Sequence, residues 1–337
     1  MTISGVPERV LIAPDSFKGT LGAFEVARAI DRGLRKYGIP TDLCPVADGG
    51  EGTLEALLAA LGGEQLTATV HDPLGRRIEA PFGLVGADGR ETVAIVETAS
   101  ASGLHLVGRG ERDPIKASTQ GTGELIAAAV GSGAGTVYLG VGGSATTDGG
   151  AGAIRAMQRC DGIGDTKLVV LCDVRTPFED AARVFGPQKG ATPSDVRRLT
   201  QRLARIARGW ERDPRGVMMT GAAGGLAGGL WAVFRAELVN GAAFVLDAVG
   251  FDRRMRQARE VVTGEGKLDE LSLAGKLVSE IATRARQAGV PCDAIVGKRE
   301  LDSFGLRVLD LQAVLEASTT AEIEAAACEL GALISRY

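Results

Sequence analysis

Residues 9–15 of the chain read RVLIAPD, an apolar run that ends at a proline and an aspartate. A turn, SFKGT, follows at 16–20, and apolar residues then recur with helical spacing from 21 to 37. The segment TDLCPV (41–46) repeats the strand pattern, and ADGGEGT (47–53) repeats the acidic exit before a second helical stretch. Two strands that each lead into a helix predict a parallel βαβ unit.

The other end of the chain shows the same alternation of strand and helix. VVTGEG (261–266) reads as a strand with an acidic glycine exit, and a helix is expected at 276–288. Strands at 293–296 and 311–315 and a helix at 320–334 complete the pattern. The two ends therefore predict one parallel sheet of the Rossmann or flavodoxin-like kind.

The middle of the chain has a different character. VHDPLGR (70–76) is rich in turn residues, and the strand-like pieces at 78–85 and 92–97 are expected to be antiparallel. Further helices are predicted at 124–130, 152–158 and 192–209, and further strands at 137–141 and 168–173. The predicted fold class is α/β with two domains: residues 1–71 plus 255–337 form the parallel-sheet domain, and 72–254 form an inserted mixed α/β domain.

Composition narrows the classes of function. A chain of 337 residues with a net charge of −4 and 4% aromatic residues argues against a nucleic-acid partner. The five cysteines form no CxxC pair, so neither a zinc site nor a disulfide frame follows, and reduced thiols suit a cytoplasmic protein. Uncharged stretches at 125–147 and 216–234 are long enough to span a bilayer, but their glycines and polar breaks predict no membrane segment. No signal peptide is expected, and a homodimer is left open.

Lysine is rare in this chain, and most of the lysines are next to a glycine. Five of the eight lysines are next to a glycine, namely Lys18, Lys189, Lys267, Lys276 and Lys298. A compact ammonium group beside accessible backbone amides is what a phosphate cradle uses. Surface turns are the alternative explanation for these pairs.

Acidic residues also lie in glycine-rich loops after predicted strands. Asp48 and Glu51 share the sequence DGGEG, Asp148 begins DGG, and Glu265 lies between two glycines. Ligands of open α/β sheets bind beyond the carboxyl ends of the strands, so these acids are candidates for metal binding or proton transfer. Helix N-capping is the alternative for Asp48 and Asp148.

Common catalytic motifs are missing or incomplete. The Walker A, GxSxG and HExxH patterns are absent. GVGGSA (140–145) fits GxGxxA after a strand, but no convincing acidic partner follows about 20 residues later. An anion-binding loop is therefore the favoured interpretation, with a nicotinamide oxidoreductase as an alternative.

Several motifs together resemble one known family. They are APDSFKGTL (13–21), VADGGEGT (46–53), DPLGR (72–76), STQGTGELI (118–126), GVGGSATTDGGAG (140–152), VFGPQKGA (184–191), GAAGGL (221–226) and TGEGKLD (263–269). In this order they resemble the bacterial glycerate kinase family, whose members phosphorylate D-glycerate with ATP. The chain departs from the family pattern at Thr147, where an asparagine is usual, at 175–176 and 218–220, and in a shortened segment before Leu168.

The resemblance and the chemistry of phosphoryl transfer imply a set of site residues. The catalytic candidates are Lys18, Asp148 and Asp173, with either aspartate as the general base. The residues expected to bind substrate or its phosphate oxygens are Asp15, Ser16, Arg76 and Lys189. The nucleotide phosphates are expected to lie against Gly142, Gly143, Ser144, Gly149, Gly264 and Gly266, and the Mg²⁺ candidates are Asp48, Glu51 and Glu265. A structural salt bridge is the alternative for Arg76.

The predicted function is thus transfer of the γ-phosphoryl group of ATP to D-glycerate, giving 2-phosphoglycerate, with Mg²⁺ as cofactor. The expected partners are a small hydroxy acid and a nucleotide. The alternative is a nucleotide-binding regulatory protein, or a catalytically altered relative that acts on another hydroxy acid.

Overall fold

The structure is a computed structural model that describes residues 9–17, 19–86, 91–160, 162–274 and 276–335. The chain divides into two compact units, each described separately. The first contains the residues up to Asp48 and those from Ala242 onward, and the second contains Gly49–Gly241. Within the described residues, no helix has the length and apolarity needed to cross a bilayer.

The first unit is built on a five-stranded parallel sheet with the order β11-β10-β9-β1-β2. Its strands are β1 (Val10–Pro14), β2 (Thr41–Leu43), β9 (Glu260–Glu265), β10 (Cys292–Val296) and β11 (Val314–Glu316). Its helices are α1 (Ala23–Arg35), α9 (Gly241–Ala248), α10 (Phe251–Met255), α11 (Leu277–Ala288), α12 (Ser303–Leu309) and α13 (Thr320–Ile334). The two ends of the chain meet where β1 pairs in parallel with β9, which confirms the predicted parallel sheet from both termini.

Burial explains why these strands are almost wholly apolar. The residues of β1 and β10 are buried along their whole length. Helices α1 and α13 pack closely together and share a core with Ile12, Val262 and Ile295 of the sheet. A second cluster around Val278 and Val296 includes residues of α11. Helices on both faces leave the parallel strands no solvated side, so their sequences do not alternate.

The second unit contains a six-stranded mixed sheet with the order β3-β4-β5-β6-β7-β8. Its strands are β3 (Glu64–His71), β4 (Arg77–Val85), β5 (Val93–Glu97), β6 (Thr136–Gly140), β7 (Lys167–Cys172) and β8 (Glu237–Asn240). Its helices are α2 (Thr53–Leu61), α3 (Thr98–Ser102), α4 (Gln120–Gly131), α5 (Ala151–Arg159), α6 (Ala181–Phe185), α7 (Pro193–Arg208) and α8 (Ala222–Phe234). Pairings β3–β4 and β4–β5 are antiparallel and the rest are parallel, as expected for a mixed inserted sheet.

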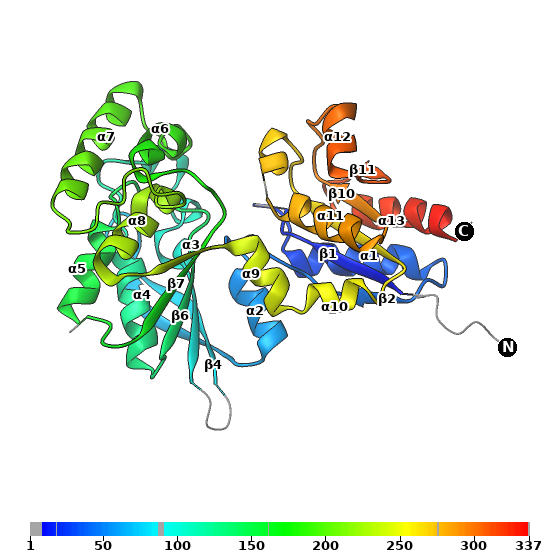
Figure 1. The fold of residues 1–337 in the computed structure, drawn as a ribbon, viewed down its shortest axis with the longest axis horizontal. Helices are drawn as coiled ribbons and strands as arrows, with labels where there is room; N and C mark the ends of the chain where they lie inside the picture. The colour runs from blue at the N-terminus through cyan, green and yellow to red at the C-terminus, as the bar shows by residue number, and fades with distance from the viewer. Residues whose placement is uncertain (1–8, 18, 87–90, 161, 275, 336–337) are drawn as a thin grey trace. The chain divides into compact units, whose positions relative to one another are not determined.

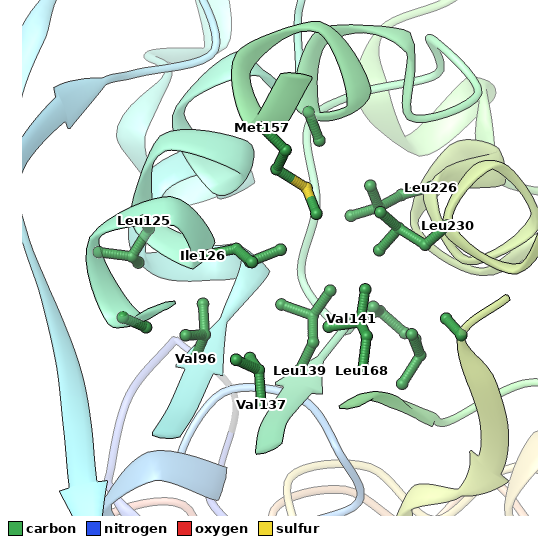
Figure 2. Close-up of a cluster of buried hydrophobic side chains, with 14 of the residues drawn as sticks. Val96, Leu125, Ile126, Val137, Leu139, Val141, Met157, Leu168, Leu226 and Leu230 are labelled. Carbon is green, nitrogen blue, oxygen red and sulfur yellow. The ribbon is translucent and has the colours of Figure 1, made fainter. Parts of the chain in front are cut away.

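The core of the second unit lies between this sheet and three helices. Figure 2 shows Leu125 and Ile126 of α4, Met157 of α5 and Leu226 of α8 facing apolar side chains of the central strands, such as Leu139. In Figure 1, α4 and α5 run beside β6 and β7. Helix α2 packs against β4 and β5. The central parallel strands are thus held rigidly, and their carboxyl ends open into loops.

The unit boundaries differ from the predicted ones. The sequence places them at 71/72 and 254/255, whereas the compact units change at 48/49 and 241/242. The segment 49–71 belongs to the second unit because β3 forms its whole ladder with β4. The segment 242–254 belongs to the first because Arg284 of α11 bonds Asp247 and Asp252.

Candidate active site

Two of the predicted loops lie against each other at the carboxyl ends of the parallel strands of the second unit. The amide of Gly142 donates to the carbonyl oxygen of Gly49 (3.4 Å). A Cβ atom on Gly142 would lie 2.5 Å from the Cα of Gly50, which no side chain tolerates. The acidic loop at 49–53 and the loop at 140–148 therefore form one surface, and Gly142 is required by close approach rather than by a turn.

The loop at 140–148 is also supported from behind by the segment that follows β5. The amide of Ala145 donates to the carbonyl oxygen of Ser102 (2.8 Å), and the amide of Leu104 donates to that of Gly143 (2.8 Å). Gly143 has a φ of +71°, in the left-handed region. These bonds hold the loop to the end of α3 and the residues that follow it, and α3 leads directly out of the central strand β5.

Lys189 is buried beneath this loop. Its ammonium group donates to the Ser144 hydroxyl (3.0 Å) and to the carbonyl oxygen of Thr146. Burial lowers the pKa of Lys189 to about 7, and the negative charges of Asp148 and Asp173 partly oppose that shift. The structure thus brings Lys189 and Ser144 together, and Lys189 is only 2% exposed.

Asp148 is completely buried, and its carboxylate accepts several hydrogen bonds. Oδ2 accepts from the backbone amides of Thr119 (3.0 Å) and Gly152 (3.0 Å), and Oδ1 accepts from that of Gly150 (3.1 Å). The Thr119 hydroxyl also donates to both oxygens. Asp148 therefore ties the start of α5 to the start of α4. The N-cap residue of α5 is Gly150, so Asp148 does not cap the helix itself but holds amides at its start, which is a structural role close to the N-capping alternative.

Asp173 has a different environment, although it too follows a parallel strand. It comes directly after β7 and is half-buried. Its Oδ2 lies 3.7 Å from the position that a Cβ would take on Gly142, so the carboxylate faces the junction of the two loops. Glu51, on the acidic loop, is exposed.

Glu97 holds the acidic loop where it enters α2, and the sequence does not single it out. It ends β5 and is buried, and its Oε1 accepts from the amide of Leu54 (2.8 Å), with further bonds from the amides of Gly52 and Thr53. Burial raises the pKa of Glu97 to about 7, against the opposing effect of these amides. The signal in the sequence is an acid at the end of an apolar strand, but it lacks the neighbouring glycines that mark the other loops.

The first unit carries its own cluster at the carboxyl ends of β1 and β9. Asp15 and Ser16 follow β1 and are buried, and Oδ1 of Asp15 accepts from the amide of Ser16 (2.7 Å). The amide of Asp15 donates to the carbonyl oxygen of Gly264 (2.8 Å), and Oε1 of Glu265 accepts from the Ser272 hydroxyl (2.6 Å). The structure therefore brings together Asp15, Ser16 and the strand exit at 264–266. Asp48 is buried in the same unit, and Lys18 lies outside the described residues.

Arg76 and Gly149, which the sequence predicts to contact ligands, form hydrogen bonds with other residues of the protein. The guanidinium of Arg76 bonds the Asp72 carboxylate and the Leu106 carbonyl oxygen (2.9 Å), as in the salt-bridge alternative. Burial raises the pKa of Asp72, but hydrogen bonds from the amide and the guanidinium of Arg76 and from the amide of Leu74 bring it below its usual range. The amide of Gly149 donates to the carbonyl oxygen of Gly224 (3.1 Å). In this conformation these groups stabilise the loops of the second unit.

The carboxylates do not form an all-protein metal cage. In the part of the chain that the structure describes, no group of three or more His, Cys, Asp or Glu side chains could hold a metal ion. Mg²⁺ in nucleotide enzymes commonly takes one or two carboxylates and completes its shell with phosphate oxygens and water. The exposed carboxylate of Glu51 is compatible with that kind of binding.

Comparison with known proteins gives one consistent result. The family model for the glycerate kinase family matches residues 10–160 and 155–332. Glycerate kinase of Halalkalibacterium halodurans is 40% identical over 86% of this chain and 85% of its own length, and glycerate 2-kinase of Escherichia coli is 38% identical over the same shares. A crystal structure of a protein from Salmonella typhimurium LT2, titled glycerate kinase 2, superposes with a TM-score of 0.79 at 34% identity, covering 97% of this chain and 98% of that one. The chain belongs to the glycerate kinase family.

Proposed function

We propose that this protein is an ATP-dependent glycerate kinase that transfers the γ-phosphoryl group of ATP to the 2-hydroxyl of D-glycerate. Relatives that are 38–40% identical over most of the chain are named glycerate kinase, and the Escherichia coli relative is named glycerate 2-kinase. The structural observation that supports the proposal best is the packing of the 140–148 loop on the acidic loop, with Asp173 facing their junction.

The 140–148 loop is the proposed phosphate-binding element of the second unit. Gly142 packs directly on Gly50 and its amide donates to Gly49, which leaves the amides of Gly143 and Ser144 as the groups that a phosphate can approach closely. Charge on the moving phosphoryl group is spread over its oxygens, and fixed N–H dipoles stabilise such charge without rearranging. In the first unit, Asp15, Ser16 and the 264–266 segment are the proposed contacts to substrate and nucleotide.

Asp173 is the proposed general base. A base must come within hydrogen-bonding distance of the acceptor hydroxyl, and the half-buried carboxylate of Asp173 can meet a ligand at the loop junction. Asp148 is fully buried and accepts bonds from Thr119, Gly150 and Gly152. We therefore assign proton transfer to Asp173 and a structural role to Asp148.

Mg²⁺ is part of the proposal. Glu51 is the residue of the second unit that would hold it, because its carboxylate is exposed on the acidic loop. When bound with the nucleotide, the ion would neutralise negative charge on the phosphates. A cytoplasmic location fits the five free cysteines, of which Cys44, Cys172 and Cys292 are buried.

Measurement of ADP release with ATP and Mg²⁺ tests the function. The expected result is turnover that depends on D-glycerate, with a product that enolase accepts directly, as it would 2-phosphoglycerate but not the 3-isomer. L-Glycerate, lactate and tartronate serve as alternative acceptors. Nucleotide binding without turnover on any of them would instead support a regulatory protein, and tight NADH binding would support an oxidoreductase.

A further inference from the structure

Lys189 is placed where an ammonium group can shape the phosphate-binding loop without touching a ligand. It ends the short turn 187–189 and is followed by Gly190, which has a φ of +94°. Its side chain is directed into the protein and is almost entirely inaccessible to solvent. A phosphate outside the loop therefore has no direct path to the ammonium group in this conformation.

The two hydrogen bonds of Lys189 are made to the loop itself. Ser144 and Thr146 lie two residues apart on the loop, and the ammonium group donates to the hydroxyl of one and the carbonyl oxygen of the other. Between them, the amide of Ala145 is held by Ser102. Three consecutive residues of the loop are thus fastened from the interior side, which fixes the direction in which the neighbouring amides point.

We infer that Lys189 is a positioning residue for phosphoryl transfer, which holds the 140–148 loop in its ligand-binding shape through Ser144 and Thr146 and does not itself contact phosphate. The inference rests on the proposed function. It replaces the direct contact to phosphate oxygens that the sequence motif suggests for this lysine.

The charged state of Lys189 depends on the groups around it. Asp148 and Asp173 attract the ammonium group, and Arg112 and Asp113 line the same small cavity beside it. Burial acts in the opposite direction and brings the pKa of Lys189 to about 7. A loop that needs the ammonium form should therefore lose its shape as the pH rises through neutrality, whereas an arginine at the same position would stay charged.

The experiment compares Lys189→Met, Lys189→Arg and the control Lys116→Met, which replaces an exposed lysine of the same unit. We expect kcat to fall about 100-fold in Lys189→Met, because small displacements of positioning groups have effects of this size. The midpoint of thermal unfolding should fall only moderately, because methionine fills the same space but leaves Ser144 and Thr146 without their donor. Lys189→Arg should retain part of the activity. Its kcat should not fall as the pH rises through about 7, whereas the kcat of the wild-type protein should. Lys116→Met should match the wild type.

Hydrogen exchange supplies a readout that does not depend on turnover. Amides of residues 142–148 should exchange at least about ten times faster in Lys189→Met than in the wild-type protein, while peptides of α7 stay unchanged. Equal exchange in the two proteins would overturn the inference even if the wild type proved inactive with glycerate. An increase in KM for ATP with kcat intact would also overturn it, because that result indicates a direct phosphate contact. If Lys189→Met does not fold, Ser144→Ala tests the same connection by the exchange rate.

Discussion

Asp148 and Asp173 show how the surroundings of one residue type decide its role. Both follow parallel strands of the same sheet, although only Asp148 has glycines beside it in the sequence. The carboxylate of Asp148 is buried and accepts from backbone amides on both oxygens, whereas that of Asp173 is half-buried at the loop junction. Two aspartates that follow strands of one sheet therefore have different environments, and the roles proposed for them differ accordingly.

Replacing each aspartate by asparagine should separate these functions. In Asp148→Asn, one oxygen becomes an NH₂ group that meets N–H donors, so we expect the free energy of unfolding to fall by about 1–3 kcal/mol. In Asp173→Asn, we expect unchanged stability and a decrease in kcat of about 10²–10⁴-fold, as for loss of a general base. Urea unfolding and steady-state kinetics provide the two measurements. A stable, inactive Asp148→Asn protein together with an active Asp173→Asn protein would reverse the assignment.

Glu97 offers a second prediction at the scale of a residue. Its carboxylate accepts from amides at the start of α2, so Glu97→Ala leaves buried N–H groups without an acceptor. We expect a loss of about 1–3 kcal/mol in the free energy of unfolding. Glu322→Ala is the matched control, because Glu322 accepts from the amides of Ser318 and Thr319 at the start of α13 but is exposed. A loss as large in the control would show that burial of Glu97 adds nothing.

Among the elements, α8 contains a run of three residues with left-handed backbone. Ala223, Gly224 and Gly225 have consecutive positive φ values of 50°, 65° and 90°. This left-handed turn lies against the 140–148 loop, because a Cβ on Gly224 would be 2.0 Å from the carbonyl oxygen of Thr146. The GAAGGL motif thus allows one backbone to pack directly on another.

Gly224→Ala should be much more destabilising than a glycine replacement that introduces only backbone strain. Gly133 is the control, since it has a φ of +93° and no atom lies within 4 Å of the position that its Cβ would take. We expect about 1–2 kcal/mol for Gly133→Ala from the left-handed conformation alone. Gly224→Ala should cost several kcal/mol more, because the loop must move. Equal losses in urea unfolding would mean that the turn and the loop separate easily.

The elements also show what the sequence can and cannot predict. Helices α7 and α13 are predicted almost to the residue, because Thr192 and Thr319 cap amphipathic stretches through local hydrogen bonds. Strand β3 is not predicted, although Leu66, Ala68 and Val70 alternate with polar residues. It is an edge strand, and it forms because it pairs with β4. A short stretch of sequence does not reveal this pairing.

The same limit applies to the site. Glycine loops carry a local signal, so Gly142, Asp148 and Lys189 can be selected from the sequence, and Asp173 can be selected as the acid that ends a predicted strand. Their roles could not be predicted, because burial and the partners of each carboxylate or ammonium group come from distant segments, as in the bond from Thr119 to Asp148. Glu97 is not singled out for the same reason, since the amide of Leu54 that it accepts from lies 43 residues earlier in the chain.

For the whole molecule, the chain order of the two units has a consequence for stability. Strand β1 pairs with β9, so the first unit is complete only when segments on both sides of the second unit have come together. Closure of so long a loop costs entropy that the buried strands must offset. Small changes in the interactions of β9 should therefore be visible in the stability of the first unit.

Glu260 and Asp293 allow the interactions of β9 to be changed by varying the pH. They lie near the starts of β9 and β10 and hydrogen-bond to each other, and burial together with the neighbouring carboxylate raises the pKa of Glu260 to about 8. The folded protein thus keeps a proton on Glu260 up to about pH 8. In the unfolded chain, where a glutamate has a pKa of about 4.3, this proton is released at a much lower pH. The contribution of this pair to the free energy of unfolding of the first unit should be largest below about pH 4.5. It should fall as the pH rises toward 8.

Glu260→Gln should remove most of this dependence between about pH 5 and 8, because an amide can share a hydrogen bond with Asp293 without titrating. Hydrogen exchange of peptides from β9 and β10 is the suitable measurement, since Trp210 and Trp231 both lie in the second unit and their fluorescence reports on that unit alone. Glu329→Gln, an exposed change on α13, is the control and should leave the pH dependence as in the wild type. If exchange protection in the wild-type protein stayed constant or increased over this pH range, after correction for the intrinsic exchange rate, the shared proton would not contribute to the stability of this sheet.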